Sequence, residues 1–342
     1  MTGNDVVVNC FPFVGLNVSG IGTEGGLAAL GVETVPIGNT PYPPEHEFDL
    51  IRRHQPTDSG NYVITGLASH LDAKAMQFVD TGRDPATLGF DLVVIAGEPV
   101  SETRKSHLAE VYDADVYEYL GSTEGGAFAF ECLEKRGLHV LGEFVHAEVV
   151  DPETGNRLDS GKNGSLAITP LIAPGDESAM PLLRYRLGDL VTKLDDSTTC
   201  SCPLSTYPRI TPPQREGSKF VVGAVNLHPL FIEQHIYDHP KLRKHVREYQ
   251  IELDYEESTG RDVLGILLEC DAEGPDEDVS DITGETSADS AGAERGNRLL
   301  RNNSHLRDTV TEAGAVRLDV RFVDQLDVGS GKPQRVIRAK GQ

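Results

Sequence analysis

Four residues of the kinds that bind zinc occur as two pairs. Cys132 and His139 lie on either side of a short basic segment, and Cys200 and Cys202 enclose one serine before Pro203. Three thiolates and one imidazole can complete a tetrahedral zinc site, although C-x-C is tighter than the usual C-x₂-C spacing. The alternative is buried thiols and a surface histidine, but the polar residues around Cys200 and Cys202 leave little core to bury them. The pattern favours a structural zinc with a closed ligand set.

Two other segments present single charges at turns. Asp189 follows a turn glycine and could accept both hydroxyls of a ribose, or it could lie in a solvated surface turn. Lys332 ends the run Gly-Ser-Gly-Lys, but Pro333 stands where a phosphate-binding loop needs Ser or Thr for magnesium, so this is not a Walker loop. Lys332 is either a mobile cation for an anionic centre or part of a surface turn.

Polar residues also follow an apolar segment at 115–120 and lie between glycines. They offer two hydroxyls and a carboxylate, from Ser122, Thr123 and Glu124. Nearer the N-terminus, Gly20-x-Gly22-x-x-Gly25 matches a dinucleotide-binding turn, but the acid expected at the end of the next strand is absent. Helix-packing glycines are the favoured interpretation there.

The elements that position these residues follow from the apolar pattern. Segments 5–12, 32–37, 90–97 and 115–120 are typical of short buried strands, and Ser101 could cap a helix over 101–112. Strand, helix, strand predicts a βαβ unit and therefore a parallel sheet. From about residue 138, short strands separated by turns, such as 151–155, predict a β-rich subdomain.

A second domain is expected after a pair of prolines near residue 212. We predict a large domain at 1–214 and a small α+β domain at 215–342. Residues 271–296 are acidic and nearly free of large apolar side chains, so they are predicted to be a solvated or disordered insertion in the small domain.

Composition narrows the class of partners. The formal charge is −23, from 54 acidic and 31 basic residues, which disfavours nucleic acid and anionic membranes as partners. Such acidity without tryptophan is typical of a halophilic source. Five cysteines, no long apolar run and no signal-peptide pattern predict a cytoplasmic protein with reduced thiols.

Taken in order, the motifs resemble the adenylate-forming ligase superfamily, in particular its phenylacetate-CoA ligase and coenzyme F390 synthetase branch. The matching segments are Ala96–Pro99 (G-A-E-P), Gly121–Glu124 (G-x-[ST]-E), Arg184–Leu190 (R-Y-R-x-x-D-L), Gly223–Pro229 with Ile232–Glu233 (R-G-V-N-x-[FY]-P…I-E) and Ser330–Ile337 (G-K-x-x-R-V-I). The Cys/His set has counterparts in zinc-containing members. The resemblance implies a truncated large α/β domain, with a parallel βαβ sheet and a β-rich subdomain, and a small α+β lid.

The family activity implies roles for these residues. Such enzymes join a carboxylic acid to AMP, release pyrophosphate and usually transfer the acyl group to CoA. By resemblance, Thr123 bonds the adenylate phosphate and Glu124 holds magnesium between the ATP phosphates. Asp189 grips the ribose with help from Arg215, and Lys332 arrives with the lid to steady negative charge. The adenine slot is lined by backbone at Gly97, Glu98 and Pro99 and at Leu120, Gly121 and Ser122.

One family feature has no match in the sequence. The Ser/Thr/Gly-rich phosphate loop belongs upstream of the strand near Asp5, so we predict that the phosphate-loop subdomain is lacking. Either an upstream-encoded chain completes the site, or the start of the sequence was misassigned, and a homodimer is the alternative assembly. Ala224, where the family has a glycine beside the thiol path, puts CoA transfer in more doubt than adenylation. Two alternatives are adenylylation of the deazaflavin F420 and a non-catalytic, zinc-stabilised remnant.

Overall fold

The computed structural model describes most of the chain in two compact units. The described residues are 3–13, 19–38, 42–57, 59–171, 181–195, 200–222, 225–256, 258, 260–271, 316–323, 325–326 and 334–338. The first unit comprises Met1–Leu71, Asp84–Pro99 and Leu108–Glu216, and the second comprises Asp72–Arg83, Val100–His107 and Gly217–Gln342. The second unit thus contains two internal segments in addition to the C-terminal part of the chain. The domain boundary at 214/215 stays a prediction. The acidic insertion lies outside the described residues from 272 onward, as does Lys332.

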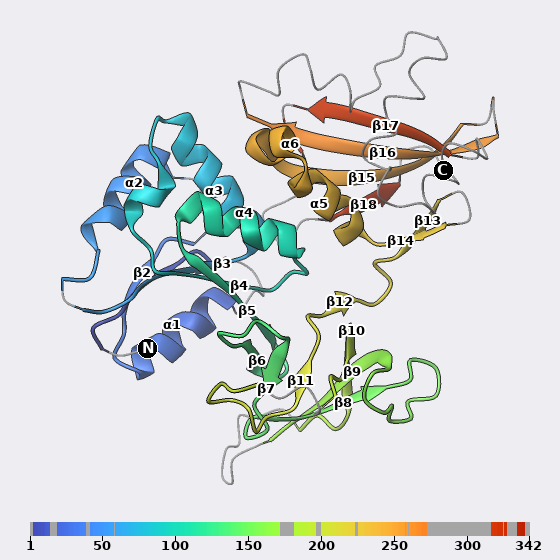
Figure 1. The fold of residues 1–342 in the computed structure, drawn as a ribbon, viewed down its shortest axis with the longest axis horizontal. Helices are drawn as coiled ribbons and strands as arrows, with labels where there is room; N and C mark the ends of the chain where they lie inside the picture. The colour runs from blue at the N-terminus through green and yellow to red at the C-terminus, as the bar shows by residue number, and fades with distance from the viewer. Residues whose placement is uncertain are drawn as a thin grey trace. The chain divides into compact units, whose positions relative to one another are not determined.

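The first unit is built on an eight-stranded mixed sheet (Figure 1). Its strands, in spatial order, are β11 (Arg209–Ile210), β7 (Leu138–Val140), β6 (Gly126–Glu131), β5 (Asp115–Ser122), β4 (Leu92–Ala96), β3 (Tyr62–Gly66), β1 (Val6–Asn9) and β2 (Glu33–Pro36). The five from β5 to β2 are parallel, and β5, β6, β7 and β11 pair antiparallel. The predicted parallel βαβ arrangement is confirmed.

Helices make the crossovers that parallel strands require. They are α1 (Ser19–Ala29), α2 (Pro44–Arg53), α3 (Ala68–Asp80) and α4 (Glu102–Tyr112), with a 3-10 turn at Pro85–Leu88. The predicted cap of α4 is confirmed, because the Ser101 hydroxyl accepts a hydrogen bond from the Arg104 amide at 3.3 Å. Gly20 packs closely, since a Cβ there would lie 2.5 Å from the Pro12 carbonyl oxygen, whereas Gly22 has open space. The helix-packing interpretation therefore holds at Gly20.

A second, antiparallel sheet completes the first unit. Its order is β12 (Gln214–Arg215), β10 (Tyr185–Thr192), β9 (Asn163–Pro170) and β8 (Val145–Val150). The predicted turn at 151–155 is present, because the Asp151 carboxylate accepts hydrogen bonds from the amides of Glu153 and Thr154 at 3.0 and 2.7 Å. This part of the first unit is the predicted β-rich subdomain. Buried apolar residues from both sheets form its core: Leu120, Phe128, Leu138, Val140, Val145, Val149, Leu166, Ile168, Leu187, Val191 and Ile210.

The second unit contains a four-stranded sheet and two short helices. The sheet order is β17 (Val316–Val323), β16 (Arg261–Cys270), β15 (Val246–Glu256) and β18 (Val336–Arg338), and β13 (Phe220–Val222) pairs with β14 (Val225–Leu227). The helices α5 (Pro229–Asp238) and α6 (Pro240–His245) each start with proline after a histidine whose Nδ1 accepts a helix amide. This is the small α+β C-terminal domain that the resemblance implied. No described helix is long and apolar enough to cross a membrane.

Candidate functional site

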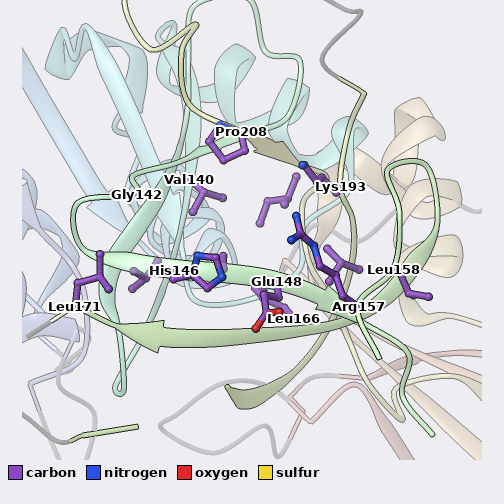
Figure 2. A pocket seen from close by; sticks show the side chains of 14 residues that line it. Val140, Gly142, His146, Glu148, Arg157, Leu158, Leu166, Leu171, Lys193 and Pro208 are labelled. Carbon is purple, nitrogen blue, oxygen red and sulfur yellow. The ribbon is translucent and has the colours of Figure 1, made fainter. Parts of the chain in front are cut away.

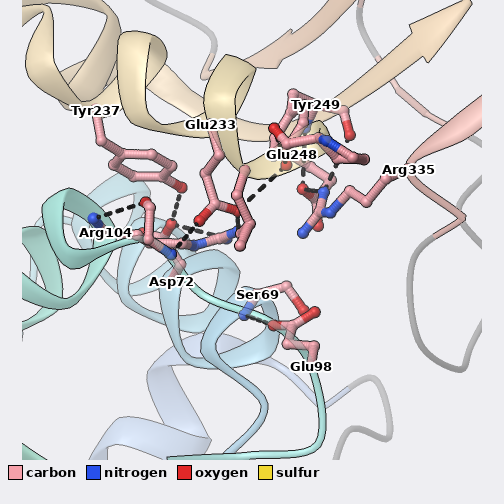
Figure 3. A network of polar contacts seen from close by, with 12 residues as sticks. Ser69, Asp72, Glu98, Arg104, Glu233, Tyr237, Glu248, Tyr249 and Arg335 are labelled. Carbon is pink, nitrogen blue, oxygen red and sulfur yellow. Dashed lines mark hydrogen bonds and ion pairs between the residues drawn. The ribbon is translucent and has the colours of Figure 1, made fainter. Parts of the chain in front are cut away.

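Two predicted nucleotide loops lie at the same edge of the parallel sheet. Ala96 at the end of β4 is in register with Tyr119 near the end of β5, so the loops that follow these strands are neighbours. Gly97 has a φ of +90°, which favours glycine. The Glu98 carboxylate accepts a hydrogen bond from the Ser69 amide at 2.6 Å, in the first turn of α3 (Figure 3). The Glu98 side chain thus holds a helix, which leaves the backbone of this loop as its surface for a ligand.

The polar loop after β5 is a closed turn with two uncommitted side chains. The Ser122 hydroxyl accepts a hydrogen bond from the Gly125 amide at 3.0 Å, which fixes the turn. Thr123 is exposed and Glu124 is half-buried. Neither side chain makes a hydrogen bond or ion pair with the described residues. The turn therefore presents a hydroxyl and a carboxylate that are available to a ligand.

Asp189 and Arg215 lie opposite one another on two neighbouring strands. They are in register on β10 and β12, and the Arg215 guanidinium lies 3.3 Å from the Asp189 carboxylate and donates to the Leu187 carbonyl at 2.7 Å. Gly188 lies beside this pair: its φ is +76°, which favours glycine, and a Cβ there would lie 3.4 Å from the guanidinium carbon, an ordinary van der Waals contact. The Asp189 side chain is 17% exposed, so it is shielded but reachable.

The polar turn and the strand of Asp189 share one core. A Cβ on Gly125 would lie 2.8 Å from the Ile168 side chain on β9, and β9 pairs with β10. Leu120, just before the turn, and Leu187, just before Asp189, belong to the same buried cluster. The first unit thus brings these two predicted segments together.

The four predicted zinc ligands converge in the first unit. Their ligand atoms all lie within 4.8 Å of one another, and all four residues are buried: Cys132, His139, Cys200 and Cys202. The Sγ atoms of Cys132 and Cys200 are 3.4 Å apart, and Cys202 Sγ is 3.5 Å from His139 Nε2. Two sulfurs bound to one tetrahedral zinc lie about 3.8 Å apart, so the cluster fits this ion with a small expansion.

The ionisation of the cluster suits a metal only in part, since burial and the two neighbouring thiols raise the pKa of the Cys200 thiol to about 12. Burial opposes ionisation of the Cys132 thiol, but hydrogen bonds from the Glu134 and Lys135 amides and from neighbouring thiols lower its pKa overall. Burial also lowers the pKa of His139, which keeps its imidazole neutral. Thiolate sulfur and neutral imidazole nitrogen are the forms that bind zinc.

A buried ionic network in the second unit was missed by the sequence analysis. The Arg104 guanidinium, 1% exposed, lies 3.0 Å from the Asp72 carboxylate and 3.2 Å from that of Glu233 (Figure 3). Asp72 also accepts a hydrogen bond from the Tyr237 hydroxyl and lies 3.1 Å from His107 Nε2. Within this network only Glu233 belonged to a motif recognised in the sequence, the Ile-Glu pair. The contacts themselves could not be predicted, because the partners are far apart in the chain.

The network keeps Asp72 ionised. Burial alone would raise the pKa of its carboxyl, but Arg104, His107 and the Tyr237 hydroxyl together hold that pKa below its usual value. Since the charges are paired and desolvated, removing one partner would leave another buried and uncompensated. The network therefore links Asp72 of α3 and Arg104 and His107 of α4 to α5 within the second unit.

Comparison with known proteins identifies sequence relatives. No family model matches the chain. The chain is 32% identical over 243 residues to a phenylacetate-coenzyme A ligase of Thermus thermophilus, covering 69% of this chain and 50% of the relative. It is 28% identical over 264 residues to that of Aromatoleum evansii, covering 76% and 55%. The chain spans about half the length of the curated relatives it matches.

Solved structures share the fold. A 2-hydroxyisobutyryl-CoA ligase in the postadenylation state aligns with a TM-score of 0.74 at 19% identity, covering 99% of this chain and 66% of that one. A benzoate CoA ligase from Burkholderia xenovorans LB400 aligns with a TM-score of 0.61 at 16% identity, covering 98% and 61%.

These findings define the class of protein: the fold is that of the adenylate-forming ligases. The sequence relatives of the chain are phenylacetate-CoA ligases, of which the chain covers about half. The resemblance stated from the motifs is confirmed, and so is the α/β fold class with a small C-terminal domain, whereas the truncation stays a prediction.

Proposed function

We propose that this chain carries the adenylate-binding part of a ligase that activates a carboxylic acid with ATP and then transfers the acyl group to CoA. The observation that carries the proposal is the sequence relationship to phenylacetate-coenzyme A ligases over more than two thirds of the chain. The placement of the motif residues supports it, since the polar turn and Asp189 share one core. Because the chain spans half of those relatives, the whole reaction is proposed for the complete enzyme.

Each motif residue has a proposed task in adenylation. Asp189 accepts hydrogen bonds from the ribose hydroxyls, and Arg215 holds its carboxylate in place. The Thr123 hydroxyl donates to the α-phosphate, where the carboxylate oxygen of the acid attacks and pyrophosphate leaves. Lys332, in the C-terminal part, steadies the negative charge that develops on that phosphate and on the acid. The backbone of the loops at 97–99 and 120–122 lines the adenine slot.

Two metals belong to the proposal. Glu124 would hold magnesium, which neutralises charge on the ATP phosphates. The cluster of Cys132, His139, Cys200 and Cys202 would hold zinc, and its four protein donors give that ion a structural task.

The substrate is proposed to be a small carboxylic acid of the aromatic type. Support comes from the names of the sequence relatives, which are phenylacetate-coenzyme A ligases. F420 remains an alternative for the same chemistry. An upstream-encoded chain that supplies the phosphate loop stays part of the proposal, and a homodimer is the alternative assembly.

The test is ATP–pyrophosphate exchange in high salt with phenylacetate. We would measure it for this chain alone and with any product encoded directly upstream. Exchange under either condition supports the proposal, and exchange lost in Asp189→Asn links it to this site. Silence under both conditions, with the zinc site loaded, would count against it.

The buried Cys/His cluster favours one second candidate, a zinc-stabilised binding protein without ligase activity. The two functions separate in a melting experiment, because only a ligand that prefers the folded state raises the Tm. If ATP with magnesium, and an acyl-AMP mimic, leave the Tm unchanged while chelation lowers it, the binding-protein function is the better account.

A further inference from the structure

A cavity of about 450 Å³ opens between the two sheets of the first unit (Figure 2). Strands β8 and β9 form one wall, and β7 and β11 form the other. The second wall is held by a hydrogen bond of 2.8 Å from the Val140 amide to the Pro208 carbonyl. None of the residues assigned to nucleotide or zinc binding lines the cavity.

The inner surface of the cavity is apolar. It is lined by Val140, Val145, Val149, Leu166 and Ile210, which are all buried. These side chains also belong to the core that the two sheets share, so their positions are fixed by packing. A cavity of this volume with an apolar wall suits the hydrocarbon part of a small ligand.

Two cations border this apolar surface. Arg157 and Lys193 both line the cavity, and Figure 2 shows the nitrogens of both side chains directed into it. Backbone bridges anchor them, Arg157 to Val150 and Lys193 to Ile210. Neither side chain has an ion pair or hydrogen bond with a described residue.

Arg157 and Lys193 are unusual because they have no carboxylate partner among the described residues. The chain has 54 acidic residues against 31 basic ones, so a basic side chain with no carboxylate partner in the described part of the chain is unexpected. The one carboxylate that lines the cavity, Glu148, lies 2.8 Å from the Arg184 guanidinium and is already paired. His146 also lines the cavity and is exposed. The net charge offered to a ligand is therefore positive.

We propose that this cavity binds a small organic anion, a carboxylate on an aliphatic or aromatic body, separately from the nucleotide site. The apolar body would lie against Ala147 and Leu158, the partly buried apolar side chains that line the cavity over this core, and the carboxylate would accept hydrogen bonds from Arg157 and Lys193. Binding is non-covalent and does not depend on the proposed ligase activity.

The chain has no tryptophan, which allows a specific optical test. Leu171 lines the cavity and is 49% exposed, so Leu171→Trp places a single reporter there. Titration with octanoate is expected to change its fluorescence to saturation, whereas octylamine, with the opposite charge, is expected to give no saturable change. Unmodified protein is tested in parallel by saturation-transfer NMR on octanoate, which removes any effect of the reporter.

Removal of the positive charges of Arg157 and Lys193 then tests the proposal. In the reporter background, Arg157→Gln with Lys193→Gln should weaken octanoate binding about tenfold or more. Lys162→Gln, an exposed lysine of the same subdomain that does not line the cavity, should leave it unchanged. Asp189→Asn should also leave it unchanged, which separates this site from the nucleotide site. Absence of saturable binding in both assays, or equal binding by the double variant, would overturn the proposal.

Discussion

Arg215 and Asp189 form an ion pair at 3.3 Å from opposite positions on two neighbouring strands. Gly188, directly before Asp189, has a left-handed backbone, and a Cβ there would be in ordinary van der Waals contact with the guanidinium. A carboxylate that is already held in one orientation loses little entropy when it binds a ribose diol. The geometry of one glycine thus bears on nucleotide affinity.

The first prediction concerns Gly188→Ala. The left-handed conformation should destabilise the variant by about 1–2 kcal/mol. Relaxation of that strained backbone should shift the adjacent Asp189–Arg215 pair and weaken binding of an acyl-AMP mimic. Gly161→Ala is the matched control, since Gly161 has a φ of +82° and open space around it. Thermal unfolding and calorimetric titration are the measurements. Equal nucleotide affinity in both variants would contradict the role given to Arg215.

The second prediction concerns Glu124, whose carboxylate has no partner among the described residues. Glu124→Gln keeps the shape of the side chain but removes the charge that attracts a divalent cation. The magnesium concentration needed for half-maximal ATP binding should rise about tenfold, while affinity for the magnesium-free acyl-AMP mimic stays the same. A variant that loses both equally would show that the turn is merely distorted.

The third prediction concerns the Cys/His cluster. Purified protein should contain one zinc per chain, and Cys132→Ser should lose it, as measured by elemental analysis. Cys270→Ser, a half-buried thiol in the second unit, should retain full zinc content. Chelation should lower the Tm of the wild type because the metal stabilises only the folded chain. A wild type that binds no zinc after reduction and reconstitution would refute the site.

The fourth prediction concerns the buried network around Asp72. Its folded pKa is lowered, so the stabilisation is present above the unfolded pKa of about 3.9 and is lost as the pH falls through the folded value. Asp72→Asn should destabilise the protein by about 3–5 kcal/mol at pH 7, since it leaves Arg104 short of a partner. The difference in Tm between wild type and variant should shrink as the pH is lowered below about 4. A difference that stays constant with pH would mean that Asp72 is neutral in the folded protein.

The sequence predicted the parallel sheet and the site segments because both depend on local patterns. The apolar runs at 90–97 and 115–120 became adjacent strands, so the loops after them had to meet at one edge of the sheet. The Cys/His cluster was predictable because its residue types are rare and have few other uses. In both cases, residue type and local sequence pattern were enough for the prediction.

The rest depends on contacts between distant parts of the chain. Tyr237 bonds Asp72 across 165 positions, and neither residue looks unusual within its own helix. The cavity at Arg157 and Lys193 likewise arises only when β8 and β11 lie opposite one another. No periodicity in a single segment encodes such pairings. Lys332, which the motif order predicts to be catalytic, lies outside the described residues and is best tested by mutation.

Binding of a phenylacetyl-sulfamoyl adenosine, a stable mimic of the acyl adenylate, tests the central claim most directly. It needs neither pyrophosphate chemistry nor CoA. Calorimetry with the zinc-loaded chain in high salt should give saturable binding, and Asp189→Ala should weaken it about tenfold or more through loss of the ribose contacts. No binding to the wild type, or equal binding to Asp189→Ala, would contradict the account.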